Sequence, residues 1–155
     1  MPASMPAKSA AAAISGALLL AACGSSAAAG SSSPPSCHAQ YEAWKHGPAR
    51  AVAKRLESAL KGVGAAGSAQ DIPHLNSALS AAGKDAAALR SWPMPRCADP
   101  KGYYGTLLAR VTAAGDNAKS ASGLGGLLLA MGPLRTVPGI EAKLTAELSQ
   151  TVGKH

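Results

Sequence analysis

The chain has 155 residues, contains no Phe, is only 3% aromatic, and carries a formal net charge of +7 at pH 7. This length suits one domain with a single core, and an apolar fraction dominated by Ala with few β-branched residues disfavours β-sheet folds. The Lys and Arg residues are spread along the chain and do not alternate with aromatic residues, which argues against a nucleic-acid-binding protein.

The first 22 residues have the organisation of a secretory signal peptide. Lys8 precedes an apolar stretch from Ser9 to Ala22, which is shorter than the roughly 20 residues that a membrane-spanning helix needs. The stretch ends in Leu20-Ala21-Ala22-Cys23 and resembles the lipobox of bacterial prolipoproteins. In that family a diacylglycerol is attached to the cysteine thiol and a peptidase cuts before the cysteine. The resemblance therefore implies that Cys23 is the lipidated first residue of a mature protein on the outer face of the cell membrane.

Two other fates of this segment stay open. Cleavage by the ordinary signal peptidase after Ala27-Ala28-Ala29 would release a free secreted protein, and absence of cleavage would leave a helical anchor. Neither explains why the apolar stretch stops at a lone cysteine. Translation from Met1 or from Met5 gives the same segment downstream.

Residues 23–36 have the composition of a flexible linker. The stretch from Gly24 to Ser36 is small, polar and interrupted by Pro34-Pro35. Its root-mean-square reach is roughly 20 Å, and its full extension is at most about 45 Å. We expect this linker to hold a domain of residues 37–155 close to the membrane.

Apolar residues at helical spacing predict the first two helices of this domain. A first stripe runs from Tyr41 to Val63, where Gly47-Pro48 indicates either a kink or a restart and Gly62 to Ser68 predicts the helix end. Asp71 is a predicted N-cap for a second helix. The apolar stripe of that helix consists of Ile72, Leu75, Leu79, Ala82, Ala86 and Leu89.

Helix caps and apolar spacing in the second half of the domain predict two further main helices. Trp92 to Pro95 stops the second helix, and Asp99-Pro100 is a predicted cap for a third, whose apolar side consists of Tyr103, Tyr104, Leu107, Leu108 and Val111. Val137-Pro138 starts the last helix, with Ile140, Leu144, Leu148 and Val152 facing inward. A short fifth helix near residues 123–132 stays open, because its glycines leave continuity with the preceding helix uncertain. The predicted fold is an all-α antiparallel bundle of four main helices.

The cysteines test this topology. Cys37 precedes the first helix and Cys97 lies between the second and the third, so an up-down-up-down bundle brings both to one end, at a spacing that suits a disulfide. The same end gathers all five aromatic residues, which we take as a small core around the disulfide or as a contact site for a ligand or partner. These residues are Tyr41, Trp44, Trp92, Tyr103 and Tyr104.

No pattern in the sequence predicts catalysis, a metal site or a cofactor. The four histidines, His38, His46, His74 and His155, lack metal-ligand spacing, and Asp71 and Asp99 are explained as helix caps. The sequence therefore favours a non-enzymatic, lipid-anchored interaction module for an envelope protein, a polymer or a small ligand. The alternative is a structural accessory whose basic surface lies against anionic lipids or cell-wall polyanions. The Ala- and Gly-rich region also resembles small actinobacterial lipoproteins, a resemblance that implies no activity.

Overall fold

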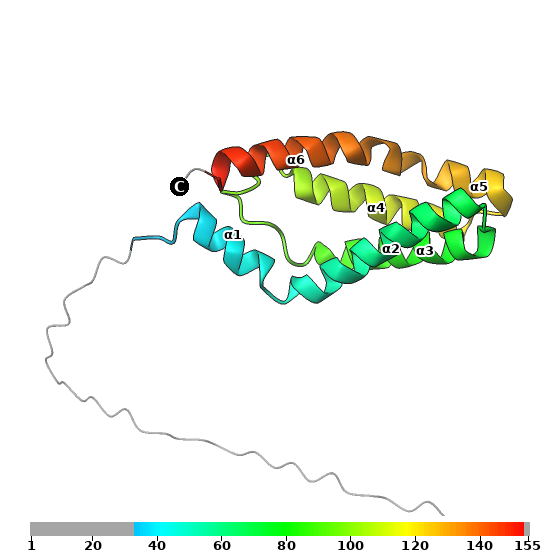
Figure 1. The fold of residues 1–155 in the computed structure, drawn as a ribbon, viewed down its shortest axis with the longest axis horizontal. Helices are drawn as coiled ribbons and strands as arrows, with labels where there is room; N and C mark the ends of the chain where they lie inside the picture. The colour runs from blue at the N-terminus through cyan, green and yellow to red at the C-terminus, as the bar shows by residue number, and fades with distance from the viewer. Residues whose placement is uncertain (1–32, 154–155) are drawn as a thin grey trace, which may run out of the picture. The chain divides into compact units, whose positions relative to one another are not determined.

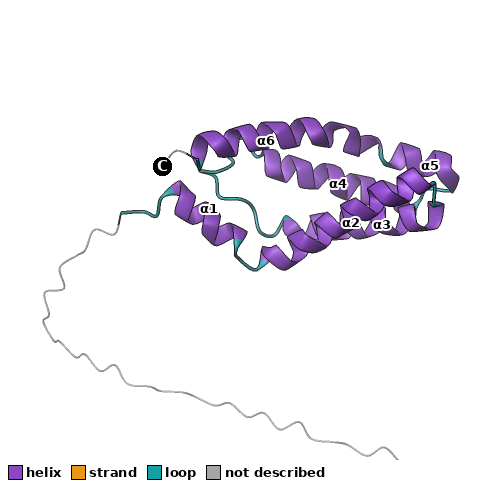
Figure 2. Ribbon diagram, in the orientation of Figure 1, coloured by secondary structure: helices purple, strands orange, loops and turns teal. Residues whose placement is uncertain are grey.

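A computed structural model describes residues 33–153 of the chain. The described residues contain helices and no strand (Figure 2). The predicted segments at residues 1–22 and the linker up to residue 32 lie outside the described residues.

The first predicted helix is in fact two helices. Helix α1 spans Cys37–Lys45 and is capped by the Ser36 hydroxyl, which accepts a hydrogen bond from the Ala39 N–H. Helix α2 spans Ala49–Ala69 after a break at Gly47-Pro48, so the chain restarts there. The predicted end at Gly62 to Ser68 is wrong, because α2 continues to Ala69 and ends at Gln70 in the left-handed conformation. Burial of Val63 and Ala66 within that segment outweighs the low helix propensity of its glycines.

Helix α3 spans Ile72–Leu89 and begins as predicted. The Asp71 carboxylate accepts a hydrogen bond from the His74 N–H at 3.2 Å, which is an N-cap contact. The predicted stripe faces the core from Leu75 to Leu89, whereas Ile72 is partly exposed. The segment from Trp92 to Pro95 follows as an irregular loop.

Helix α4 spans Tyr103–Lys119 and begins after Gly102, which has a positive φ of 70°. Helix α5 spans Gly123–Ala130, separate from α4, and a 3₁₀ helix, η1, spans Gly132–Thr136. Helix α6 spans Val137–Thr151. On α6, Ile140, Leu144 and Leu148 are half-buried, and Glu147 is buried among them.

The long helices alternate in direction, which confirms the predicted antiparallel all-helical bundle. Helix α3 packs against α2 and α4, and α4 also packs against α6. Helix α1, the C-terminal end of α6 and the loop before α4 gather at one end, and α5 lies at the other (Figure 1). We call these the disulfide end and the α5 end.

Leucine and alanine side chains fill the core at both ends. Leu56, Leu89, Leu108 and Val111 lie in the half toward the disulfide end, and Leu75, Leu79, Leu127 and Ala118 in the half toward α5. At the disulfide end itself a smaller group forms around Met94, Ala98 and Val152.

Candidate functional site

A disulfide joins the N-terminal residue of α1 to the loop between α3 and α4. The Cα atoms of Cys37 and Cys97 are 5.6 Å apart, and the bond closes a loop with a sequence separation of 60 residues. This pairing confirms the predicted disulfide. Cys23, the predicted lipidation site, lies outside the described residues.

Three of the predicted aromatic residues are in direct contact at this end. Trp44 of α1 stacks on Tyr41 with ring centroids 5.8 Å apart, and meets the Tyr104 ring edge-on at 5.2 Å. The Trp44 indole N–H donates a hydrogen bond to the Trp92 carbonyl oxygen at 3.1 Å. This bond ties α1 to the loop that carries Cys97.

The other two aromatic side chains lie apart from this contact. Trp92 packs against the core that includes Leu89 and Leu108. Tyr103 lies beside Lys101, whose ammonium nitrogen is 6.0 Å from its ring centroid. All five rings are half-buried, so the cluster is neither a closed core nor an open aromatic surface.

Asp99 organises the start of α4. Its carboxylate is buried, with 6% of the residue exposed, and accepts hydrogen bonds from the N–H groups of Tyr103 at 2.8 Å and Tyr104 at 2.9 Å. Asp99 therefore caps α4 through its side chain, as predicted. It does not occupy the N-cap position, however, which belongs to Gly102 three residues later. These first-turn N–H groups are therefore occupied and are not available to a ligand.

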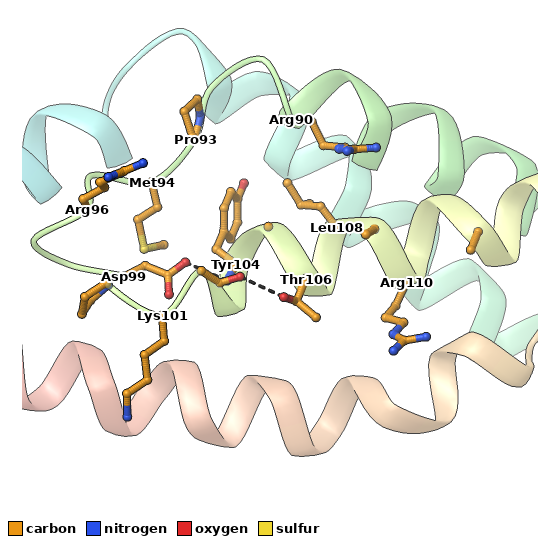
Figure 3. Close-up of a pocket in the computed structure, with 15 residues that line it drawn as sticks. Arg90, Pro93, Met94, Arg96, Asp99, Lys101, Tyr104, Thr106, Leu108 and Arg110 are labelled. Carbon is orange, nitrogen blue, oxygen red and sulfur yellow. Dashed lines mark hydrogen bonds between the residues drawn. The ribbon is translucent and has the colours of Figure 1, made fainter.

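A groove of about 880 Å³ runs between the 93–96 loop, the end of α3 and one face of α4 (Figure 3). We call it the Tyr104 groove, because the Tyr104 ring rises from α4 into the space between Pro93 and Arg90, with its hydroxyl at the tip. Met94 lies on the 93–96 loop side of this ring, and Thr106 lines the groove from α4. The charged residues that line the groove are Arg90, Arg96, Asp99, Lys101 and Arg110.

The four basic side chains of the groove lack acidic partners. All four are exposed, and among residues 33–153 none has a carboxylate oxygen within 4.0 Å. Figure 3 shows Arg96 and Lys101 toward one end of the groove and Arg90 and Arg110 toward the other. Because these four basic side chains share the groove with a single carboxylate, that of Asp99, the groove carries a net positive charge.

The Tyr104 hydroxyl has no hydrogen-bond partner among the described residues. Burial raises the pKa of Tyr104 above its ordinary value, because desolvation penalises the phenolate. The hydroxyl therefore keeps its proton at neutral pH and can donate it in a hydrogen bond. A neutral donor in a groove lined by basic side chains is suited to an anionic oxygen.

Sequence reasoning missed this groove. Residues 90–110 hold four of the basic residues and a single acidic residue, and this local excess is the signal that could have found it. The residues 33–153 hold no group of three or more His, Cys, Asp or Glu side chains that could bind a metal ion.

Comparison with known proteins gives no relative from which a role could be transferred. No family profile, curated protein or solved structure shows significant similarity to the chain. Within the described residues, no helix has both the length and the apolar character needed to cross a bilayer.

Proposed function

We propose that the chain is a lipid-anchored, non-enzymatic interaction module on the outer face of a bacterial cell membrane, and that the Tyr104 groove binds an anionic ligand of the envelope. The observation that carries the proposal is that the groove is lined by four basic side chains without acidic partners among the described residues, and by Tyr104, whose hydroxyl has no hydrogen-bond partner there. Phosphate and carboxylate groups are the natural ligands of such a set, because charge-assisted hydrogen bonds are stronger than neutral ones.

The lipid anchor rests on the sequence. The Leu20-Ala21-Ala22-Cys23 ending of the apolar stretch supports lipidation at Cys23, and the linker that follows joins the bundle at Cys37. Such a tether keeps Cys37, where it joins the bundle, within about 45 Å of the membrane surface. The acyl chains add about 0.8 kcal/mol per buried methylene, which suits a durable anchor.

Mass spectrometry of the mature N-terminus tests the anchor. We expect a chain that begins at Cys23 with a diacylglycerol on its sulfur. An unmodified N-terminus downstream of Cys23 would exclude the anchor without touching the groove.

A matched pair of charge variants tests the groove. Arg90→Gln with Arg96→Gln removes two charges from it, and Lys84→Gln with Lys143→Gln removes two exposed charges elsewhere. The full chain is titrated with soluble polyphosphate and with phosphatidylglycerol vesicles, which separates a polymer ligand from a lipid head group. We expect at least a tenfold loss of affinity for the groove pair and less than a twofold loss for the control pair.

The second candidate function, a structural accessory held by its whole basic surface, predicts a different result. Its affinity would fall equally in both charge pairs, because every exposed charge contributes alike to a diffuse attraction. Tyr104→Phe sharpens the distinction, since it removes only the hydroxyl. We expect it to weaken binding several-fold if the ligand sits in the groove, and an unchanged affinity would favour the diffuse surface.

A further inference from the structure

The large apolar side chains that are exposed among the described residues all lie at the α5 end of the bundle. Leu129 is 81% exposed, Leu128 53% and Leu124 36%, all on α5, and the fourth exposed large apolar residue, Ile72, begins α3 at the same end (Figure 1). We call Leu124, Leu128 and Leu129 the α5 patch. Leu127 and Ala130 are buried and fix α5 to the bundle, so the patch is presented on a packed element.

This end is also nearly neutral, although the chain as a whole is basic. In residues 62–80 and 111–134 the Asp, Glu, Lys and Arg residues are Asp71, Asp116 and Lys119. Lys119 pairs with Asp116 at 2.7 Å and Asp71 bonds to His74 at 2.6 Å. The next charge along the chain is Arg135 in η1. The unpaired cations of the Tyr104 groove lie toward the opposite end.

We infer that the α5 patch is a contact surface for a second copy of this chain. Two copies that meet α5 to α5 bring together their neutral ends and keep their basic grooves as far apart as the bundle allows, whereas other approaches bring like charges together. The same three leucines on both sides form a self-complementary, twofold-symmetric contact.

The area of the patch sets the strength of this contact. Its exposed surface is on the order of 300 Å², well under half of the roughly 800 Å² per partner in a stable interface. The dimer is therefore weak in dilute solution, and its formation rests on the proposed lipid anchor, which would concentrate the chain on a membrane surface.

Disulfide trapping of the full chain tests this contact. Gly125→Cys places a thiol on α5, where an added Cβ has no atom within 4 Å, and Ala142→Cys places one at an exposed position of α6 as the control. Mass analysis first verifies that Cys37 and Cys97 remain bonded to each other. Under mild oxidation we expect the Gly125→Cys chain to form covalent dimers at least tenfold faster than the Ala142→Cys chain.

Adding Leu128→Gln and Leu129→Gln to the Gly125→Cys chain is expected to lower its rate to that of the control. Both leucines are exposed, so the unfolding midpoint should not change. Equal rates for the two thiol positions would overturn the proposal. Trapping in intact cells of an adduct that contains a different protein would also overturn it, because a foreign partner would then occupy the patch. So would stronger quenching of tryptophan fluorescence by brominated lipids in a Leu129→Trp chain than in the unsubstituted chain, because the bilayer would then contact the patch.

Discussion

Gly83 of α3 and Gly115 of α4 face each other backbone to backbone. A Cβ added to Gly115 would lie 2.6 Å from the Gly83 Cα and 2.8 Å from the Leu79 carbonyl oxygen, and a Cβ added to Gly83 would lie 2.7 Å from the Gly115 Cα. Both glycines are buried. The two central helices therefore cross at a point where neither tolerates a side chain.

Gly115→Ala is expected to lower the free energy of unfolding by about 2 kcal/mol, because overpacking against rigid backbone outweighs the gain in helix propensity. Gly64→Ala is the matched control, since a Cβ at Gly64 in α2 meets no atom within 4 Å. It should stabilise the chain by up to about 1 kcal/mol. Chemical denaturation measures both, and a stabilised Gly115→Ala chain would contradict the close crossing.

The sequence predicts the elements better than the contacts between them. Local patterns found the α3 stripe and the Asp71 cap, and the topology that they implied placed Cys37 beside Cys97. The glycines at the end of α2 predict a helix end too early, because α2 continues through them to Ala69. Whether a glycine ends a helix or lets two helices touch depends on the partner helix, which no local pattern contains.

The Tyr104 groove was missed for the same reason. Every basic residue is visible in the sequence, but its partner depends on the tertiary fold. Arg55 of α2 pairs with Asp85 of α3 at 3.2 Å across 30 residues, whereas Arg90 and Arg96 have no such carboxylate within the described part of the chain. The sequence shows the local excess of basic residues between positions 90 and 110. That these cations lack carboxylate partners within residues 33–153 becomes apparent only when the helices are packed.

Loss of the disulfide is expected to lower stability strongly. Replacing Cys37 and Cys97 together by Ser removes a loop constraint over a sequence separation of 60 residues, worth about 4 kcal/mol on the chain-entropy model. Thermal unfolding with and without reductant measures the effect. Thiol labelling of the denatured, unreduced protein should find neither of these cysteines free, and an unfolding midpoint that ignores reductant would count against the bridge.

The buried carboxylate of Glu147 is expected to destabilise the fold. It is buried on α6, and its Oε2 atom has no hydrogen-bond partner among the described residues. An unsatisfied buried polar group costs about 1–3 kcal/mol, so Glu147→Met, which keeps the length of the side chain, should raise the free energy of unfolding by about 1 kcal/mol. A loss of stability in denaturant titration would show that the carboxylate makes a favourable contact.

Asp71 is expected to contribute to the acid sensitivity of the fold. The His74 backbone N–H and then the His74 ring bond its carboxylate and lower the pKa of Asp71. A lowered folded pKa means that the stabilisation is present above the unfolded pKa of about 3.9 and is lost as the pH falls through the folded pKa. The unsubstituted chain should therefore lose stability more steeply below pH 4 than Asp71→Asn, which keeps a capping side chain. An NMR titration in which the Asp71 carboxyl behaves as an ordinary aspartate would refute this.

Trp44 is expected to act in the fold more than in binding. Its indole joins α1 to the loop through the Trp92 carbonyl and contacts the rings of Tyr41 and Tyr104. Because the ring is only half-buried, Trp44→Ala should lower the free energy of unfolding by about 2 kcal/mol, less than the 3–5 kcal/mol of a fully buried aromatic. At temperatures where the variant stays folded, its affinity for polyphosphate should remain within twofold of the unsubstituted chain. An unchanged unfolding midpoint together with lost binding would instead make Trp44 a ligand contact and would extend the site from the Tyr104 groove across the aromatic cluster.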